Sequence, residues 1–403
     1  MWEQIRSNQI KSGVLTVLMG ALLLVLGYFL GLYFFDSPTA GLVVALMVWA
    51  FMSLLAYFQG GSILLSISGA RKIRPEDHPR LYHVVEEMKI ASGLEKMPDI
   101  YIVDDPALNA FATGRDVNHA SVAITSGLLQ KLNRDELQGV IGHEIAHIKN
   151  RDVLLMSLLT VLLGSIVILA WYATRFMFFT GAGGGRRSSS SRGGDPFQLI
   201  LLIVGLVLMI LAPIIAQIIY LAVSRKREYL ADASSALYTR YPDGLASALE
   251  KLATSNTHVR TANKATAPMY TADPFQKRGL SAEGLMSTHP PIAERIRILH
   301  SMAGASVAEY EEAYRKIKGK GVVPASALAG TGAVGLRATS VDTKPLEEVQ
   351  EKIERTRETS DLMWRMGNYK TIDCECGARL RIPPHFRARD VRCPHCGRIH
   401  PVP

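Results

Sequence analysis

Four long apolar stretches limit what this chain can fold into. They run from Val14 to Phe35, Gly41 to Phe58, Val153 to Ala173 and Leu199 to Val223, and none contains Lys, Arg, Asp or Glu. The hydrocarbon core of a bilayer is about 30 Å thick and needs about 20 apolar helical residues to cross. Buried helices of soluble proteins rarely reach that length without a charge. The stretches therefore predict four transmembrane helices, of which the second is the shortest.

The distribution of Lys and Arg predicts how the spans are oriented. Ten of these residues lie near span ends on one side, against three or four on the other, mostly in the loop 180–196. Because basic residues are retained in the cytoplasm, we expect both termini and the segment from about 66 to 152 there, in a multi-pass inner (plasma) membrane protein. Attraction to anionic lipid explains the net charge of +9 more simply than nucleic acid does. The bilayer is therefore an expected partner and nucleic acid is not.

Apolar periodicity and turn residues outline the soluble parts. Alternation and β-branched residues predict short strands at 99–103, 109–113 and 120–125. Helical spacing predicts helices at 74–94, 133–150, 227–240, 243–255, 292–304 and 345–366. Asn133 and Glu136 have the spacing of a capping box at the start of the second helix. Residues 262–291 contain four prolines and no clear period, which indicates a long loop near a cleft.

The segment HEIAH, residues 143–147, has the spacing of a metal site. Positions i and i+4 share one face of a helix, so His143 and His147 could bind one zinc ion, with Glu144 as general base for the attacking water. The alternative is a pair of surface histidines on an amphipathic helix. The apolar and small neighbours, such as Gly142 and Ile145, disfavour it because a buried pair without a ligand would be costly.

The segment REYLAD, residues 227–232, supplies the next candidates. A catalytic zinc has three protein ligands, and Glu228 is the candidate for the third. Asp232 lies one helical turn further on, where it could accept a hydrogen bond from the far nitrogen of a metal-binding histidine. The alternative is two solvated acids at a helix end. The longer HExxHxxGxxH pattern is excluded, because Asn150 and Val153 hold its Gly and His positions.

Both candidate ligand segments adjoin predicted spans. His147 precedes Val153 by six residues, about 9 Å along a helix, and Glu228 follows Val223 by five, about 7.5 Å. If both helices run on unbroken, a zinc ion between them would sit roughly 10 Å from the membrane boundary, on the cytoplasmic side. That position suits a substrate that is in the membrane or is being pulled from it.

The C-terminal tail carries a second metal pattern. Two knuckles, CECG and CPHCG, contain the four cysteines of the chain, Cys374, Cys376, Cys393 and Cys396. The spacing predicts a zinc ribbon with a structural four-thiolate site that supplies folding energy to a short segment. The tight first pair leaves His395 or His400 as a replacement ligand, and redox cysteines are the alternative. The tail is basic, so it could bind an acidic peptide, a protein partner or RNA. Of these we expect a protein partner.

With these segments the chain resembles the HtpX-like membrane-bound zinc metallopeptidases, which are related to the CAAX prenyl proteases. The likeness covers about residues 10–302 and is carried by NAFATG (109–114), ITSGLL (124–129), HEIAHIKNRD (143–152), REYLAD (227–232) and STHPPIAERI (287–296). The resemblance implies a thermolysin-like (gluzincin) fold in which His143, His147 and Glu228 bind zinc and Glu144 activates water. It also implies cleavage of damaged or misassembled membrane proteins.

Three further residues have roles that the resemblance implies. The strand that begins at Asn109 would pair with the extended substrate backbone, unless its amide caps its own turn. His289 would donate to the developing oxyanion or occupy the open zinc position in a latched state. Alternatively, His289 begins a helix before Pro290 and Pro291. Arg295 would assist substrate binding at the same site.

The expected fold class is a mainly α membrane protein, with four transmembrane helices, a thermolysin-like α+β catalytic domain and a small zinc ribbon. The expected parts are a first transmembrane hairpin (1–65), a first catalytic segment (66–152), a second transmembrane hairpin (153–223), a second catalytic segment (224–318), a flexible linker (319–343), a charged helix (344–369) and the ribbon (370–403).

The expected function is that of a zinc-dependent integral membrane endopeptidase with one catalytic and one structural Zn²⁺. Its substrates would be damaged or misfolded membrane proteins and unfolded polypeptides on the cytoplasmic side. One alternative is a CAAX-type prenyl-peptide processing protease, which the presence of only four spans disfavours. Another is a non-catalytic zinc-binding membrane adaptor, which the intact Glu144 disfavours because a structural site needs no base.

Overall fold

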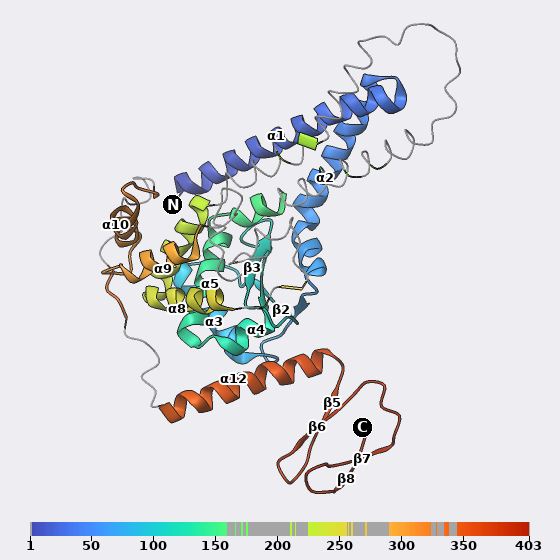
Figure 1. Cartoon of the computed structure of the whole chain (residues 1–403), viewed down its shortest axis with the longest axis vertical. Helices are drawn as coiled ribbons and strands as arrows, with labels where there is room; N and C mark the ends of the chain where they lie inside the picture. The colour runs from blue at the N-terminus through green and yellow to red at the C-terminus, as the bar shows by residue number, and fades with distance from the viewer. Residues whose placement is uncertain are drawn as a thin grey trace.

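The structure is a computed structural model, and Figure 1 shows its whole chain. It describes residues 2–158, 166, 171, 175, 210–211, 214, 225–255, 257, 259–260, 271, 290–323, 328, 334–337 and 345–402. Most of the two later predicted spans, and the predicted loop 262–291 apart from Thr271, Pro290 and Pro291, lie outside these residues.

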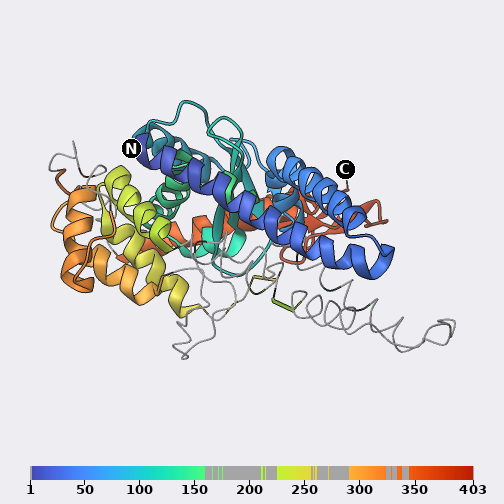
Figure 2. The same cartoon turned by 90° about the horizontal axis from the view of Figure 1, so that it is seen from above.

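Two long helices, α1 (Trp2–Phe35) and α2 (Pro38–Ile67), run side by side and antiparallel (Figures 1 and 2). Asp36, at a φ of 48°, and the N-cap Ser37 form the turn between them. A Cβ added to Gly27 would lie 2.3 Å from the Ala45 side chain, so glycine allows the two backbones to approach. Within the described residues, α2 is the one helix long and apolar enough to cross a membrane, and the apolar part of α1, Thr16–Leu32, is shorter.

The helix α2 extends past the predicted span. Its apolar run was expected to end at Phe58, but the helix continues to Ile67. Leu64 and Leu65 of this extension are buried against the sheet, together with Phe111. The sequence-based limit was too short because packing on the sheet, rather than contact with lipid, stabilises the last part of the helix.

A four-stranded sheet lies under α2. Its strands are β1 (Arg71–Lys72), β2 (Asp99–Val103), β3 (Ala110–Gly114) and β4 (Ala120–Thr125), in the order β1-β2-β4-β3. β2 and β4 are parallel, whereas the β1–β2 and β3–β4 pairs are antiparallel. The three predicted strands are confirmed, with β3 shifted by one residue. Within this sheet β3 is an edge strand.

The other face of the sheet is covered by helices that form the main core. These are α3 (Pro79–Ser92), α4 (Ser126–Lys131) and α5 (Arg134–Lys149), and the same core extends to α8 (Pro242–Thr254), α9 (Ile292–His300) and α10 (Val307–Lys318). The predicted helix over 74–94 is observed as α3, and its buried apolar face consists of Leu81, Val84, Val85 and Met88. Alternate residues of the strands face this core and α2, which explains why the strands are buried on both sides.

The helix α5 begins and ends on local signals. The Asn133 side chain and the Glu136 carboxylate each accept a main-chain N–H from the other residue, at 2.9 and 2.7 Å, which confirms the capping box. At the other end Asn150 is the C-cap, Arg151 has a φ of 59°, and a new helical stretch begins at residue 152. Arg151 ends α5, because a residue at positive φ ends a right-handed helix, so the condition that this helix runs unbroken into the next span is not met. The estimated distance from the metal site to the membrane therefore does not hold.

The helix 225–239 packs closely against α5. Ser235 Oγ donates to the Gly139 carbonyl at 2.7 Å, and a Cβ on Gly142 would lie 3.1 Å from that same Oγ. On the next side, a Cβ on Gly139 would meet the Leu245 main-chain N of α8 at 2.6 Å. Glycine at these two positions allows the helix 225–239 and α8 to approach α5 as closely as they do.

Part of the predicted flexible linker is attached to the domain. The main-chain N–H of Ala305 donates to the Val334 carbonyl at 2.8 Å, and that of Arg337 donates to the Arg240 carbonyl at 2.9 Å. The Arg337 guanidinium also donates to Asp135 of α5 at 2.8 Å. Leu336 of this segment is exposed, so these hydrogen bonds rather than burial of that apolar side chain hold residues 334–337 in place.

The C-terminal part consists of the helix α12 (Pro345–Met366) and two hairpins, seen at the bottom of Figure 1. The strands pair as β5 (Lys370–Asp373) with β6 (Arg379–Ile382) and β7 (Asp390–Arg392) with β8 (Ile399–Pro401). α12 packs on α4 and buries Thr359 and Leu362. Asp361 of α12 forms an ion pair with Arg381 at 2.8 Å, which joins the first hairpin to the helix.

His78 lies fully buried between α12 and the start of α3. Its Nδ1 accepts the Leu81 main-chain N–H at 3.2 Å, and its Nε2 lies 3.4 Å from the Thr359 hydroxyl. Burial lowers the pKa of His78 from 6.5 to about 4. Nδ1 lies 3.3 Å from Glu358, but it is already an acceptor, so this contact is not an ion pair at neutral pH.

We predict that His78 makes the fold acid-sensitive. The unfolded chain binds a proton at its ordinary pKa, so stability is present above pH 6.5 and is lost as pH falls toward about 4. The loss is on the order of 3 kcal/mol. Thermal unfolding from pH 7.5 to 4.5 should show a shallower pH dependence for His78→Asn than for wild type. The exposed His83→Asn, on the same helix, is the control, and equal slopes for all three proteins would contradict the prediction.

Candidate metal centres and active site

Three side chains from two helices converge on one point. His143 and His147 lie on α5, and Glu228 lies on the helix 225–239. The two Nε2 atoms are 3.2 Å apart, and Glu228 oxygens lie 3.6 Å from His143 Nε2 and 3.5 Å from His147 Nε2. Ligand atoms of a tetrahedral zinc, each about 2.0–2.2 Å from the metal, are roughly 3.3–3.5 Å from one another. The donor set and its spacing therefore fit zinc.

A carboxylate stands behind each imidazole. Asp232 Oδ1 lies 2.9 Å from His143 Nδ1, as the sequence predicted, and Asp152 Oδ2 lies 3.0 Å from His147 Nδ1. Such partners fix the tautomer and direct both Nε2 atoms toward the metal position. Sequence reasoning missed Asp152. The sequence does show an acidic residue just after the end of α5. Its contact with His147, however, depends on the turn at Arg151, which the sequence pattern does not predict.

Arg295 is fully buried behind this site. Its guanidinium donates to both oxygens of Asp232, at 2.8 and 2.6 Å, and lies 3.5 Å from Glu228. The sequence had suggested a substrate contact for Arg295, whereas these contacts join it to the carboxylates of the metal site. Burial opposes ionisation of Asp232, but the charge of Arg295 holds the pKa of that carboxyl below its usual range.

His143 responds to the same charges. Burial by itself would lower the pKa of His143, but hydrogen bonds to Asp232 and Glu228 raise it to about 9. The carboxylates around His143 therefore favour a positive charge at this point, and a divalent metal would take the place of the proton.

The predicted base lies beside the three converging side chains. Glu144 is 1% exposed and accepts a hydrogen bond from the Thr271 hydroxyl at 2.7 Å. Sequence reasoning missed Thr271, which lies 127 residues further along the chain and has no local motif. His289 lies outside the described residues.

Asn109 directly precedes the edge strand β3 and is buried. Its main-chain carbonyl accepts the Thr125 N–H at 3.0 Å, so it faces β4. Its side-chain oxygen accepts the Ala110 N–H at 3.1 Å. The alternative interpretation of Asn109, in which its amide makes a local turn bond, anticipated a bond of this kind. The strand that follows, β3, forms the edge of the sheet as expected.

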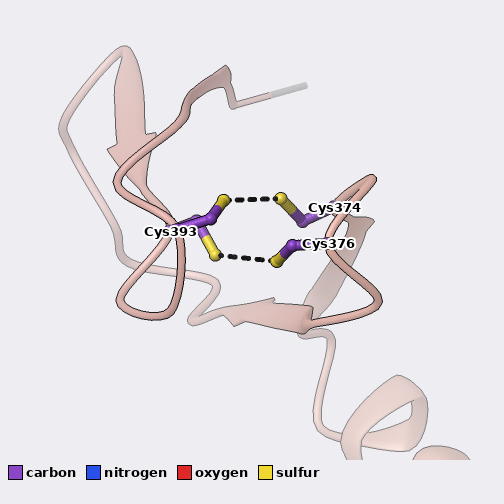
Figure 3. Close-up of side chains that lie close together, drawn as sticks. Cys374, Cys376 and Cys393 are labelled. Carbon is purple, nitrogen blue, oxygen red and sulfur yellow. Dashed lines mark hydrogen bonds between the residues drawn. The ribbon is translucent and has the colours of Figure 1, made fainter.

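The four cysteines of the tail also converge, and Figure 3 shows Cys374 and Cys376 on one turn, facing Cys393 on another. Sγ of Cys374 lies 3.5 Å from that of Cys396, and Sγ of Cys376 lies 3.7 Å from that of Cys393. Sulfur atoms about 2.3 Å from a tetrahedral zinc are roughly 3.8 Å apart. The four thiols thus match a closed site by themselves, without a histidine.

Comparison with known proteins identifies the class. The model of the family "Peptidase family M48" matches residues 75–303. A protease HtpX homolog of Streptococcus pneumoniae (strain Hungary19A-6) is 43% identical over 302 residues, which cover 75% of this chain and 100% of the relative. The homolog from strain Taiwan19F-14 is 44% identical over the same lengths. The chain therefore belongs to peptidase family M48 and is a membrane metalloprotease.

Among solved structures, the crystal structure of Ste24p from S. mikatae is similar at a TM-score of 0.36 and 20% identity. The match covers 73% of this chain and 66% of that one. The family match ends at residue 303, so α12 and the cysteine hairpins lie beyond it.

We predict that Asp232→Asn strongly destabilises the metal-free protein. Removal of one partner of a buried ion pair costs about 3–5 kcal/mol, because the other charge stays buried and uncompensated. Denaturant unfolding of the metal-free protein measures this cost. Asp243→Asn is the matched control, because Asp243 pairs with His300 at a side-chain exposure of 50%. Equal losses for the two variants would mean that the Arg295–Asp232 pair does not have this role.

Proposed function

We propose that this chain is a zinc-dependent integral membrane endopeptidase that cleaves damaged or misfolded membrane proteins and unfolded polypeptides on the cytoplasmic side. The observation that carries the proposal is the convergence of His143, His147 and Glu228 at 3.2 to 3.6 Å, with Glu144 beside them. Three protein ligands and an adjacent carboxylate are the composition of a hydrolytic zinc site, whereas a structural site has four ligands and no base.

In this mechanism the two histidines and Glu228 hold the metal. When bound there, a zinc ion would supply Lewis-acid polarisation of the scissile carbonyl and of the attacking water. Glu144 takes a proton from the water and later delivers it to the leaving amine. Asp232 and Asp152 keep the imidazoles in the orientation that binding requires. We also propose that His289 donates to the developing oxyanion or latches the open metal position.

The outer edge of β3 is the proposed site for the substrate backbone. Because Asn109 faces β4, alternation turns the main-chain groups of Ala110 and Ala112 away from the sheet. The Ala110 carbonyl already accepts the Thr271 N–H, so an extended polypeptide could add to this edge at Ala112, beside α5 and Glu144. Asn109 would hold the first residues of β3 in place. Arg295 would assist substrate binding indirectly, through its hydrogen bonds to Asp232 and to the Thr271 carbonyl.

The membrane setting is supported by the path of α2. Its apolar part leads without interruption into the extension that packs on the sheet, where a Cβ on Gly61 would lie 3.3 Å from Gly114 at the end of β3. A polypeptide that leaves the bilayer along α2 therefore reaches β3 over a short distance. We propose four spans on the basis of the four apolar stretches, and an inner-membrane location with cytoplasmic termini on the basis of the charge distribution.

For the tail we propose a second, structural zinc bound by Cys374, Cys376, Cys393 and Cys396, and a protein partner for the ribbon. The S–S distances of 3.5 and 3.7 Å support the metal. The exposed basic side chains of the hairpins, such as Arg387 and Arg392, support an acidic surface on the partner.

Two zinc ions per chain are expected by metal analysis of the purified protein. Conversion of all four cysteines to serine should leave one zinc, and His143→Ala should remove the other, because the two donor sets share no residue. A content that stays at two in the cysteine variant, or falls to none, would rule out the proposed assignment of the two sites.

Glu144→Gln should keep both zinc ions and lower the cleavage rate of an unfolded polypeptide such as casein by about 10²- to 10⁴-fold, the usual share of general-base catalysis. The amide has nearly the shape of the carboxylate but cannot accept the proton. Glu95→Gln, at an exposed position, is the control and should leave the rate unchanged. Undiminished cleavage by Glu144→Gln would exclude the mechanism.

A further inference from the structure

Thr271 lies at the junction of the edge strand, the proposed base and Arg295. It is 2% exposed. Its hydroxyl lies 2.7 Å from Glu144 Oε1 and 3.0 Å from the Ala110 carbonyl. A hydroxyl has one proton and can donate to one acceptor at a time. The bond to the carboxylate is shorter, as expected for a charged acceptor.

Main-chain bonds hold Thr271 on two further sides. Its N–H donates to the Ala110 carbonyl at 2.9 Å, and its carbonyl accepts from Arg295 Nη1 at 3.1 Å. A β-branched side chain has few χ1 rotamers. The hydroxyl is therefore a donor of fixed position, attached both to β3 and to the group that supports Asp232.

A base needs such a partner. A glutamate side chain has three rotatable bonds, and its carboxylate is useful only when one oxygen is aimed at the attacking water. The bond to Thr271 occupies Oε1 and leaves Oε2 for the water. The two residues that flank the base in the sequence, His143 and Ile145, are fixed by α5, but they do not set the rotamer of Glu144.

We propose that Thr271 is a positioning residue for Glu144, which it orients through its hydroxyl. This inference rests on the proposed function of Glu144 as the general base. The competing idea is that Thr271 occupies the place of a substrate residue, because its N–H bonds an outward-facing carbonyl of β3. A substrate mimic would need only the main-chain bonds, whereas the short bond from the hydroxyl to the carboxylate is what a positioning role requires.

The test uses the full-length protein in detergent and compares Thr271→Val with Thr271→Ser. Valine keeps the branched shape and removes the hydroxyl, and serine keeps the hydroxyl. The expected result for valine is a fall in kcat of about 10- to 100-fold with KM within about 3-fold, because an unoriented base slows chemistry and not binding. Serine should stay within about 3-fold of wild type in both constants. Zinc content and melting temperature should be the same for all three proteins.

A binding measurement separates the two ideas without relying on turnover. In a Glu144→Gln background, fluorescence anisotropy measures the Kd of a labelled unfolded polypeptide with and without Thr271→Val. The positioning role predicts an unchanged Kd. A tighter Kd, together with faster cleavage by Thr271→Val, would show that Thr271 competes with substrate and would overturn the proposal.

Two further outcomes are decisive. If the kcat of Thr271→Ser were as low as that of Thr271→Val, the hydroxyl would not be the group that matters, and the proposal would be overturned. If valine cannot be accommodated and zinc is lost, Thr271→Ala replaces it, with kcat expressed per zinc-loaded chain, and the same 10- to 100-fold fall is expected. Failure of the proposed function would appear separately, as cleavage that survives Glu144→Gln.

Discussion

The ion pair between Arg295 and Asp232 is the interaction on which the candidate active site depends. Both side chains are fully buried, and their shortest contact is 2.6 Å. Two isolated buried charges would each cost several kcal/mol, so each residue requires the other. The pair also gives Asp232 a lasting negative charge beside His143 Nδ1, which directs Nε2 toward the metal position. Because Arg295 comes from α9, Asp232 from the helix 225–239 and His143 from α5, one interaction fixes three elements and a metal ligand together.

The helix α2 joins the membrane to this site through packing. Its first part presents apolar side chains such as Val43 and Phe51 to the surroundings, and its last part covers the sheet through Leu64. The Thr113 hydroxyl of β3 lies 3.4 Å from Ser157, just beyond the end of α5, on the same side as α2. The edge strand is therefore held between α5, which carries Glu144, and the candidate membrane helix α2. The proposed substrate edge and the candidate membrane helix are thus packed against each other, which would hold the two in a fixed relation.

Local patterns predicted the parts of the site that lie on one helix, and could not predict contacts made by distant segments. The i, i+4 spacing on α5 brings His143 and His147 together, and the one-turn offset from Glu228 places Asp232 beside His143 Nδ1. Asp152 depends on a single residue at positive φ, which no periodicity reveals. Thr271 depends on a contact across 127 residues. The apolar stretch Gly41–Phe58 is shorter than α2, because a hydropathy pattern identifies side chains suited to lipid and does not detect packing on a sheet.

The segment after residue 303 is part of the scaffold, although the family match ends there. Arg337 donates to Asp135 and Gln138 on α5, and to the Thr239 carbonyl at the end of the helix 225–239. It thus bridges the two helices that supply the three converging side chains. Downstream, α12 packs on α4 and buries Leu362 in the main core. Loss of this extension would expose part of that core and would remove the ion pair between Arg337 and Asp135. The extension therefore contributes to the stability of the protease domain, and the ribbon follows a helix that is packed on that domain.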